Sequence, residues 1–161
     1  MNSTIKIDVD ERVERARNYF TAGYNCAQAV AMTFDDIMGM DVTTIALIAA
    51  PFGGGMGRMR EVCGTVSGMS LVAGSIMPSV DPKNMEQRGA NYALVQHFAE
   101  QFRNENGDIV CRRLLGLEPM VERAESAMPS QRTQEYYRKR PCAEYVATAA
   151  RIVAEYLKSE K

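Results

Sequence analysis

The sequence predicts an all-α fold, arranged as a single compact helical bundle domain that spans residues 1–161 and has about six to seven helices. Apolar residues recur with helical spacing in nearly every segment, and no series of β-rich runs separated by turn dipeptides is present. The composition, with 46% hydrophobic and 24% charged side chains, excludes a disordered chain. The one β-like pattern is the alternation of Ile5, Ile7 and Val9, so residues 1–9 are expected to form a short N-terminal strand or arm.

The N-terminal part of the chain predicts two helices. Residues 10–22 place their apolar side chains on one face among charged neighbours, and Gly23 supplies a C-terminal stop. Asn25 and Gln28 lie three residues apart, as in a capping box. This pair predicts the start of a second helix, which runs through about residue 38.

The middle of the chain predicts two helices joined by a glycine-dense loop. A third, shorter helix is expected to begin at Asp41 or Thr43 and to end before Pro51. Residues 52–60 then predict a flexible loop, and an essentially uncharged helix follows over about residues 61–77. Because this helix lacks charge, we expect it at the centre of the bundle.

The second half of the chain predicts the longest helix over residues 82–103, which Asn106-Gly107 terminates. A short helical turn is expected over residues 108–115. Residues 118–140 predict an irregular excursion, in which prolines and mixed charge mark residues 118–130 and residues 131–140 predict a short, strongly basic helix or turn. Pro141 then opens a last amphipathic helix to about residue 158.

Charge and targeting patterns exclude several classes of partner. Nineteen Lys and Arg residues against twenty Asp and Glu residues give a net charge of -1, which supplies no field to attract nucleic acid or an anionic membrane. No segment is long and apolar enough to span a membrane, and residues 1–10 contain no export signal. We therefore expect a cytoplasmic protein with an unknown redox partner, and a homodimer if the N-terminal strand pairs with its copy.

The four cysteines are Cys26, Cys63, Cys111 and Cys142. Their spacing contains no CxxC pair, so the usual zinc-ribbon and thioredoxin motifs are absent. Each cysteine falls in or near the first turn of a predicted helix, where unpaired N–H groups and about half a positive charge stabilise a thiolate. Arginines add charge near three of them, namely Arg58, Arg60, Arg112, Arg113, Arg138 and Arg140. All four cysteines are therefore candidate catalytic residues and candidate metal ligands.

The glycine-dense loop supplies candidates for cofactor binding. Its spacing fits neither the GxGxxG fingerprint nor the phosphate-binding loop. Glycine instead allows the backbone to approach a bound group closely, and N–H groups at the next helix start can form an anion-binding nest. Glycines inside that helix each cost about 1 kcal/mol relative to alanine, so tight helix packing or a cofactor must offset them. The candidates are Gly53, Gly54, Gly55, Gly57, Arg58, Gly64 and Gly68.

Several segments together resemble a known family. They are residues 23–30 (GYNCAQAV), 52–57 (FGGGMG) and 63–68 (CGTVSG), followed by the single Cys111 and Cys142. In this order they resemble the C_GCAxxG_C_C family of putative redox-active proteins over nearly the whole chain. The sequence departs from the family pattern at Thr65, where the family usually has alanine. The resemblance implies a small bacterial or archaeal protein that binds a prosthetic group, such as an iron–sulfur cluster, through its cysteines.

Three functions stay open from the sequence. In the first, the four cysteines converge from four helix starts to bind an iron–sulfur cluster or another thiophilic metal ion. In the second, the protein performs metal-free thiol–disulfide exchange with Cys63 as the attacking thiolate. In the third, a helical binding or assembly module holds a small anion at the glycine loop, and the cysteines are structural. Whether the chain is an enzyme also stays open.

Overall fold

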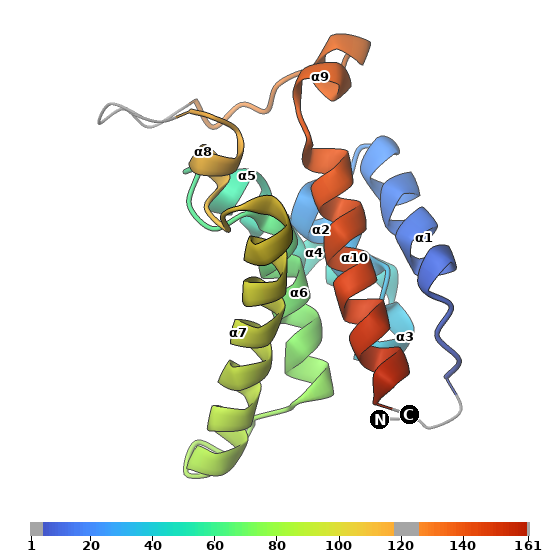
Figure 1. Cartoon of the computed structure of the whole chain (residues 1–161), viewed down its shortest axis with the longest axis vertical. Helices are drawn as coiled ribbons and strands as arrows, with labels where there is room; N and C mark the ends of the chain where they lie inside the picture. The colour runs from blue at the N-terminus through green and yellow to red at the C-terminus, as the bar shows by residue number, and fades with distance from the viewer. Residues whose placement is uncertain (1–4, 118–125, 161) are drawn as a thin grey trace.

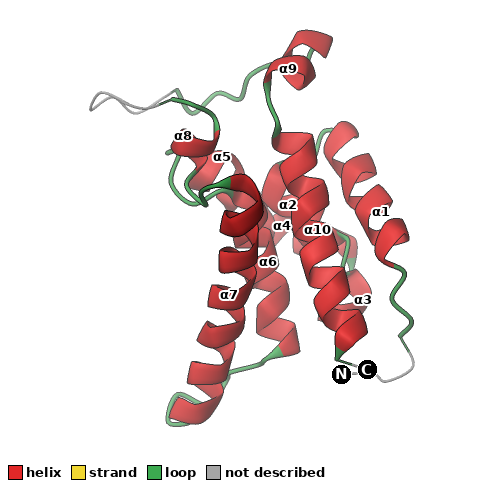
Figure 2. Ribbon diagram, in the orientation of Figure 1, coloured by secondary structure: helices red, strands yellow, loops and turns green. Residues whose placement is uncertain are grey.

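The fold is all-α, as predicted. The computed structural model describes residues 5–117 and 126–160, apart from the side chain of Lys139. The regular elements of these ranges are helices, and Figure 2 shows no strand among them. No helix of the described ranges combines the length and hydropathy that a membrane crossing requires. The elements are α1 (Val9–Thr21), α2 (Cys26–Met32), α3 (Asp35–Met38), α4 (Val42–Ala49), the 3₁₀ turn η1 (Ala50–Phe52), α5 (Gly53–Met56), α6 (Gly64–Ile76), α7 (Met85–Asn106), α8 (Cys111–Leu114), α9 (Gln134–Lys139) and α10 (Cys142–Ser159).

Two helices from opposite halves of the chain form the centre of the bundle. The uncharged helix α6 packs against α2, α3, α7 and α10, in the central place that its composition predicts. The last helix, α10, packs against α1, α2, α6 and α7. Figure 1 shows α1 in blue running beside α10 in red. The apolar stripe of α10 is buried in this arrangement, as its amphipathic pattern predicts.

Glycines allow α6 to lie very close to α2. A Cβ atom at Gly68 would lie 2.9 Å from the carbonyl oxygen of Ala27 and 2.9 Å from Cβ of Val30. A Cβ atom at Gly64 would lie 3.2 Å from the backbone nitrogen of Ala27. Tight helix packing, the first of the two alternatives considered above, therefore offsets the helix cost of these two glycines.

Of the two forms expected for residues 1–9, a strand or an arm, the described residues 5–8 form an arm. Residues 5–8 have no regular secondary structure, and Val9 is the first residue of α1. Ile7 is nonetheless buried in the hydrophobic core, so its apolar character reflects packing of an arm on the bundle. The homodimer was expected from pairing of an N-terminal strand, and the described residues 5–8 do not form that strand.

The helices outnumber the six to seven expected. The segment predicted as one helix through about residue 38 is divided into α2 and α3, because Phe34 has non-helical backbone angles (φ −115°, ψ 34°). A short helix, α5, also forms inside the predicted loop, whereas α8 lies within the helical turn expected over residues 108–115. In the predicted excursion, residues 118–125 lie outside the described residues, residues 126–133 are irregular, and α9 follows with Thr133 as its N-cap.

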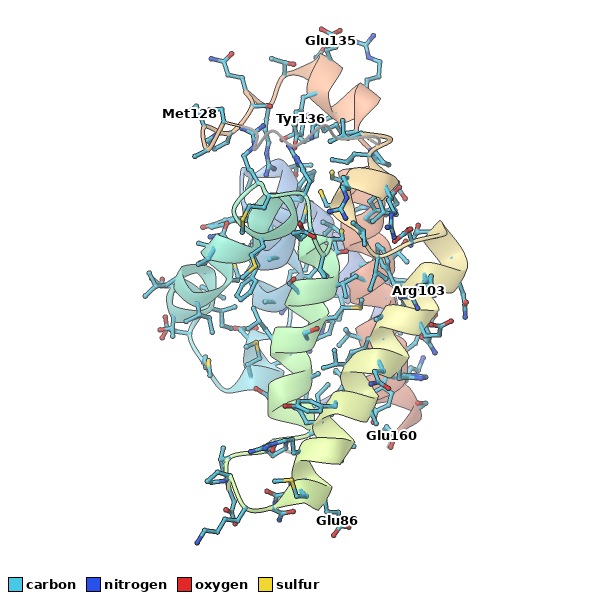
Figure 3. The ribbon with its side chains drawn as sticks, turned by 90° about the vertical axis from the view of Figure 1, so that its left-hand side faces the viewer. Glu86, Arg103, Met128, Glu135, Tyr136 and Glu160 are labelled. Carbon is cyan, nitrogen blue, oxygen red and sulfur yellow. The ribbon has the colours of Figure 1, made fainter. Side chains whose placement is uncertain are left out.

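The short elements α5, α8 and α9 gather at one end of the bundle, the upper end in Figure 1. An isolated antiparallel bridge between Val62 and Val110 ties the segment before α6 to the segment before α8. Its flanking bonds run from Cys63 N–H to a carbonyl at 2.8 Å and from Cys111 N–H to a carbonyl at 2.6 Å. Figure 3 shows Met128 and Tyr136 at this same end and Glu86 at the opposite one.

Candidate functional site

Each of the four cysteines lies at the start of a helix, as predicted. Cys26, Cys111 and Cys142 are the first residues of α2, α8 and α10, and Cys63 is the N-cap residue of α6. The predicted capping box at Asn25 fixes the start of α2. All four cysteines are free thiols.

The four cysteines line a single cavity of about 360 Å³ at the end of the bundle where α5, α8 and α9 gather. Arginines, tyrosines and the glycine-dense segment complete its wall. The arginines are Arg58, Arg60, Arg132 and Arg140, and the tyrosines are Tyr136 and Tyr145. The four helix starts therefore converge on one space, although they are widely separated in the sequence.

Cys26 and Cys142 line the same cavity, and each thiol shifts the pKa of the other. Stabilisation by the Cys26 thiol lowers the pKa of Cys142 to about 7, helped by nearby positive charge and opposed by burial. The charge comes from Arg140, Arg60 and Arg132. The same interaction, together with burial, raises the pKa of Cys26 well above its usual range. Near neutral pH the thiolate of this pair therefore forms at Cys142 in preference to Cys26.

Cys63 and Cys111 occupy a less favourable environment for a thiolate. Burial raises the pKa of Cys63 to about 12, although the Thr65 hydroxyl, 3.1 Å from its sulfur, acts in the opposite direction. Burial also raises the pKa of Cys111, against the effect of Arg60, whose Nη1 lies 3.7 Å from that sulfur. At these two helix starts burial outweighs the stabilising charges, so both thiols keep their protons at neutral pH.

These environments change the roles predicted for individual residues. The structure does not favour Cys63 as the attacking thiolate, because its buried thiol is protonated, and Cys142 fits that role instead. The sequence placed Arg60 near Cys63, and the structure brings its guanidinium to the Cys111 sulfur. The arginines that follow Cys111 form ion pairs with carboxylates: Arg112 with Glu61 at 3.1 Å and Arg113 with Asp108 at 3.6 Å.

The glycine-dense segment forms a left-handed turn with internal hydrogen bonds, where the sequence predicts a flexible loop. Backbone φ angles are positive at every residue from Gly54 to Arg58. The backbone N–H groups of residues 57–61 all donate to backbone carbonyls of residues 51–56, and these hydrogen bonds close the turn. A Cβ atom at Gly55 would lie 2.7 Å from Cβ of Cys111. Glycine at this position therefore lets the turn close around Cys111.

Most of the residues predicted to bind a cofactor lie at the cavity. Gly68 is the exception, because it packs on α2 and does not line the wall. The residues that do line it are Gly53, Gly54, Gly55, Gly57, Arg58 and Gly64.

Sequence reasoning misses three side chains of the wall. Tyr145 follows Cys142 by one helical turn on α10, so their shared helix face could have indicated it. Arg132 and Tyr136 come from the segment predicted to be irregular, where no periodicity points to a buried face. Only the folded chain places them against the cysteines.

Four thiolates are the usual ligands of iron–sulfur clusters and of structural zinc. Within residues 5–117 and 126–160, no three Cys, His, Asp or Glu side chains lie close enough together to hold a metal ion. The cysteines therefore share one cavity wall without forming a ready set of metal ligands.

Comparison with known proteins identifies the family. Residues 24–156 match the family described as "Putative redox-active protein (C_GCAxxG_C_C)", a match that covers most of the chain and includes all four cysteines. The chain belongs to this family. Searches of curated proteins and of solved structures gave no match. In this member of the C_GCAxxG_C_C family, the cysteines Cys26, Cys63, Cys111 and Cys142 all face one cavity.

Proposed function

We propose that the protein carries out two-electron thiol–disulfide exchange, with Cys142 as the attacking thiolate and Cys26 as the resolving thiol. The pairing of these two cysteines carries the proposal, because both line one cavity and their interaction places the negative charge on Cys142. An attacking thiol works best when its pKa lies near the ambient pH, and the pKa of Cys142 is about 7.

The exchange proceeds in two steps. The Cys142 thiolate attacks one sulfur of a disulfide, the disulfide bond breaks, and the departing thiolate takes a proton from solvent. Cys26 then loses its proton and attacks the Cys142 sulfur, which releases the second thiol and leaves a Cys26–Cys142 disulfide. Two electrons pass from the protein to the substrate, and a thiol reductant returns the protein to its starting state.

A trapping experiment tests the assignment. In the Cys26→Ser variant, the resolving thiol is missing, so reaction with a small disulfide should stop at a stable mixed disulfide on Cys142. Peptide mass spectrometry locates the adduct, and Cys63→Ser serves as the matched control that should still complete the reaction. An adduct on Cys63 or Cys111, with Cys142 unmodified, would overturn the assignment.

A second candidate function uses the same cavity for an iron–sulfur cluster or another thiophilic metal ion. The observation in its favour is that all four cysteines line one wall with arginines, whose positive charge would offset that of bound thiolates. The sulfur atoms would have to come closer together than they lie, since no three ligands are grouped among the described residues.

Anaerobic purification tests this second candidate. Near-stoichiometric iron and sulfide, with a visible absorption band that is lost in Cys63→Ser, would establish a cluster protein. Colourless protein that binds no iron, zinc or copper, even after reconstitution, would leave the dithiol reaction as the better account.

The cytoplasm and a redox partner belong to the same proposal. Free cysteines that cycle between thiol and disulfide suit a compartment where small thiols can re-reduce them. The formal net charge of -1 gives no support for a nucleic-acid partner.

A further inference from the structure

We propose that the cavity takes small anionic disulfides and that Arg140 holds their negative group beside Cys142; this substrate class rests on the exchange reaction proposed above. The described part of the wall carries the positive charge of Arg58, Arg60, Arg132 and Arg140 and contains no Asp or Glu. A concave wall of one charge sign concentrates ligands of the opposite sign.

Arg140 is the arginine best placed to meet a ligand at the reacting sulfur. It lies two residues before Cys142, and its charge acts on the thiols of both Cys142 and Cys111. Its guanidinium stacks on the Tyr136 ring at 5.3 Å, and within the described residues this ring, not a carboxylate, is its neighbour. A guanidinium held in this way can donate two parallel hydrogen bonds to a carboxylate or phosphate.

Arg132 has a different role in the same wall. Its guanidinium donates to the carbonyl oxygens of Phe20 at 2.6 Å and Tyr24 at 2.8 Å, and it stacks on the Phe20 ring at 4.3 Å. Arg58 donates to the carbonyl oxygen of Ser126 at 3.0 Å. The chain from Ser126 to Arg132 is therefore tied to the bundle at both ends as part of the cavity wall.

The size of the cavity limits the substrate to a small molecule. About 360 Å³ is the space of on the order of twelve waters, at roughly 30 Å³ for each water in the liquid. This volume accommodates a small disulfide and excludes a protein domain. In this arrangement Cys142 contacts the sulfur pair of the ligand. Arg140 contacts its charged group.

The reaction stays balanced for this substrate. The disulfide bond of the ligand breaks, two molecules of an anionic thiol leave, and the protein gains the Cys26–Cys142 disulfide. The two product thiols gain two electrons from the protein sulfurs; one product takes its proton from solvent, because Cys142 starts as a thiolate, and the other is balanced by the proton that Cys26 releases. Arg140 forms no covalent bond, so it is a positioning residue for the substrate.

Three small disulfides of different charge test the proposal. Reduced protein is mixed with dithiodipropionate (anionic), hydroxyethyl disulfide (neutral) or cystamine (cationic), and the rate of thiol oxidation is divided by the rate for free mercaptoethanol. This division removes the intrinsic reactivity of each disulfide. We expect the anionic probe to exceed the neutral one by about tenfold, as for one charge-assisted hydrogen bond, and the cationic probe to be slowest.

Variants then assign the preference to Arg140. Arg140→Gln should reduce the anionic-to-neutral rate ratio by about fivefold or more, and Arg140→Lys should restore part of it. The ratio is the useful readout, because any effect of the substitution on the Cys142 pKa slows both probes alike. Arg138→Gln is the matched control: Arg138 is exposed on α9 and does not line the cavity, so the ratio should not change.

The outcomes separate this proposal from the exchange reaction itself. Equal normalised rates for the three probes, or an equal fall of the ratio in Arg140→Gln and Arg138→Gln, would overturn the substrate class and leave the exchange reaction intact. If none of the three disulfides oxidises Cys26 and Cys142, the exchange reaction fails and the substrate class fails with it.

Discussion

Cys26, the first residue of α2, and Cys142, the first residue of α10, line the same cavity, and their thiols shift each other's pKa in opposite directions. The two residues come from opposite halves of the chain. Their meeting depends on the packing of α10 against α2, which places both helix starts at the same end of the bundle. Two thiols in one cavity, one of them with a pKa of about 7, suit exchange chemistry.

The pH dependence of alkylation should distinguish Cys142 from the other cysteines. Its pKa is about 7, below the usual value of a thiol, so its thiolate is present above pH 7 and is lost as the pH falls below 7. Labelling with iodoacetamide, followed by peptide mass spectrometry, should show a midpoint near pH 7 at Cys142. In Cys26→Ala the stabilisation by the Cys26 thiol is gone, so the midpoint should move to higher pH; an unchanged midpoint would contradict this account.

Two glycines of α6 should respond in opposite ways to alanine. At Gly68 the new Cβ would lie 2.9 Å from two atoms of α2, so Gly68→Ala should lower the free energy of unfolding by about 1–3 kcal/mol. At Gly74 no atom lies within 4 Å of the Cβ position. Gly74→Ala should therefore raise stability by up to about 1 kcal/mol through helix propensity alone.

Urea denaturation of the two glycine variants checks this pair. If both variants lost similar stability, the close packing at Gly68 would not explain its loss, and the gain expected at Gly74 from helix propensity would be absent. A neutral Gly68→Ala would mean that α2 and α6 can move apart at little cost.

Much of this arrangement could be predicted from local sequence. The capping box at Asn25, the Pro141 start and the placement of each cysteine at a helix start are local signals, and the structure confirms them. The glycines of α6 indicated either close packing or a cofactor, and Gly68 shows close packing. Signals of this kind involve residues within about one helical turn of each other.

The charge states of the thiols could not be predicted in the same way. A helix start and nearby arginines favour a thiolate at each position, yet burial raises the pKa of Cys63 and Cys111. Burial depends on tertiary packing, and so does the partner of Arg60, which is Cys111. The wall residues Arg132 and Tyr136 were missed because they approach the cavity only in the folded chain.

An ion pair away from the site should make stability depend on pH. Arg12, 4% exposed, donates to both carboxylate oxygens of Asp36 at 2.7 and 2.6 Å, and this holds the pKa of Asp36 below its usual value. A lowered carboxyl pKa stabilises the fold above the usual pKa of about 4, and this contribution is lost as the pH falls through the lower, folded value. Asp36→Asn should therefore destabilise the protein by about 2 kcal/mol at pH 7, and by less in acid.

Asp35→Asn is the matched control for that ion pair. Asp35 lies 3.6 Å from Arg15, and both side chains are 36% exposed, so its loss should change stability by no more than about 0.5 kcal/mol. Thermal unfolding of both variants between pH 3 and pH 7 makes the comparison. A deficit for Asp36→Asn that stays constant over this range would contradict the ion-pair explanation.

Thr65 should tune the reactivity of Cys63. Its buried hydroxyl lies 3.1 Å from the Cys63 sulfur and acts to lower the pKa of that thiol. Thr65→Val keeps the shape and removes the hydroxyl, so alkylation of Cys63 at alkaline pH should slow by about threefold or more. Thr65→Ser, which retains a hydroxyl, should react like the parent protein; equal rates in the valine and serine variants would show that the contact has no effect on the thiol.

The most direct test of the Cys26–Cys142 couple is to map the disulfide that forms as the protein is equilibrated over a range of thiol–disulfide redox buffers. Each sample is alkylated, digested and analysed by mass spectrometry. We predict a two-electron transition in which the Cys26–Cys142 crosslink forms first, while Cys63 and Cys111 stay alkylated. A first crosslink that contains Cys63 or Cys111, or four thiols that stay free under oxidising conditions, would contradict the proposed function.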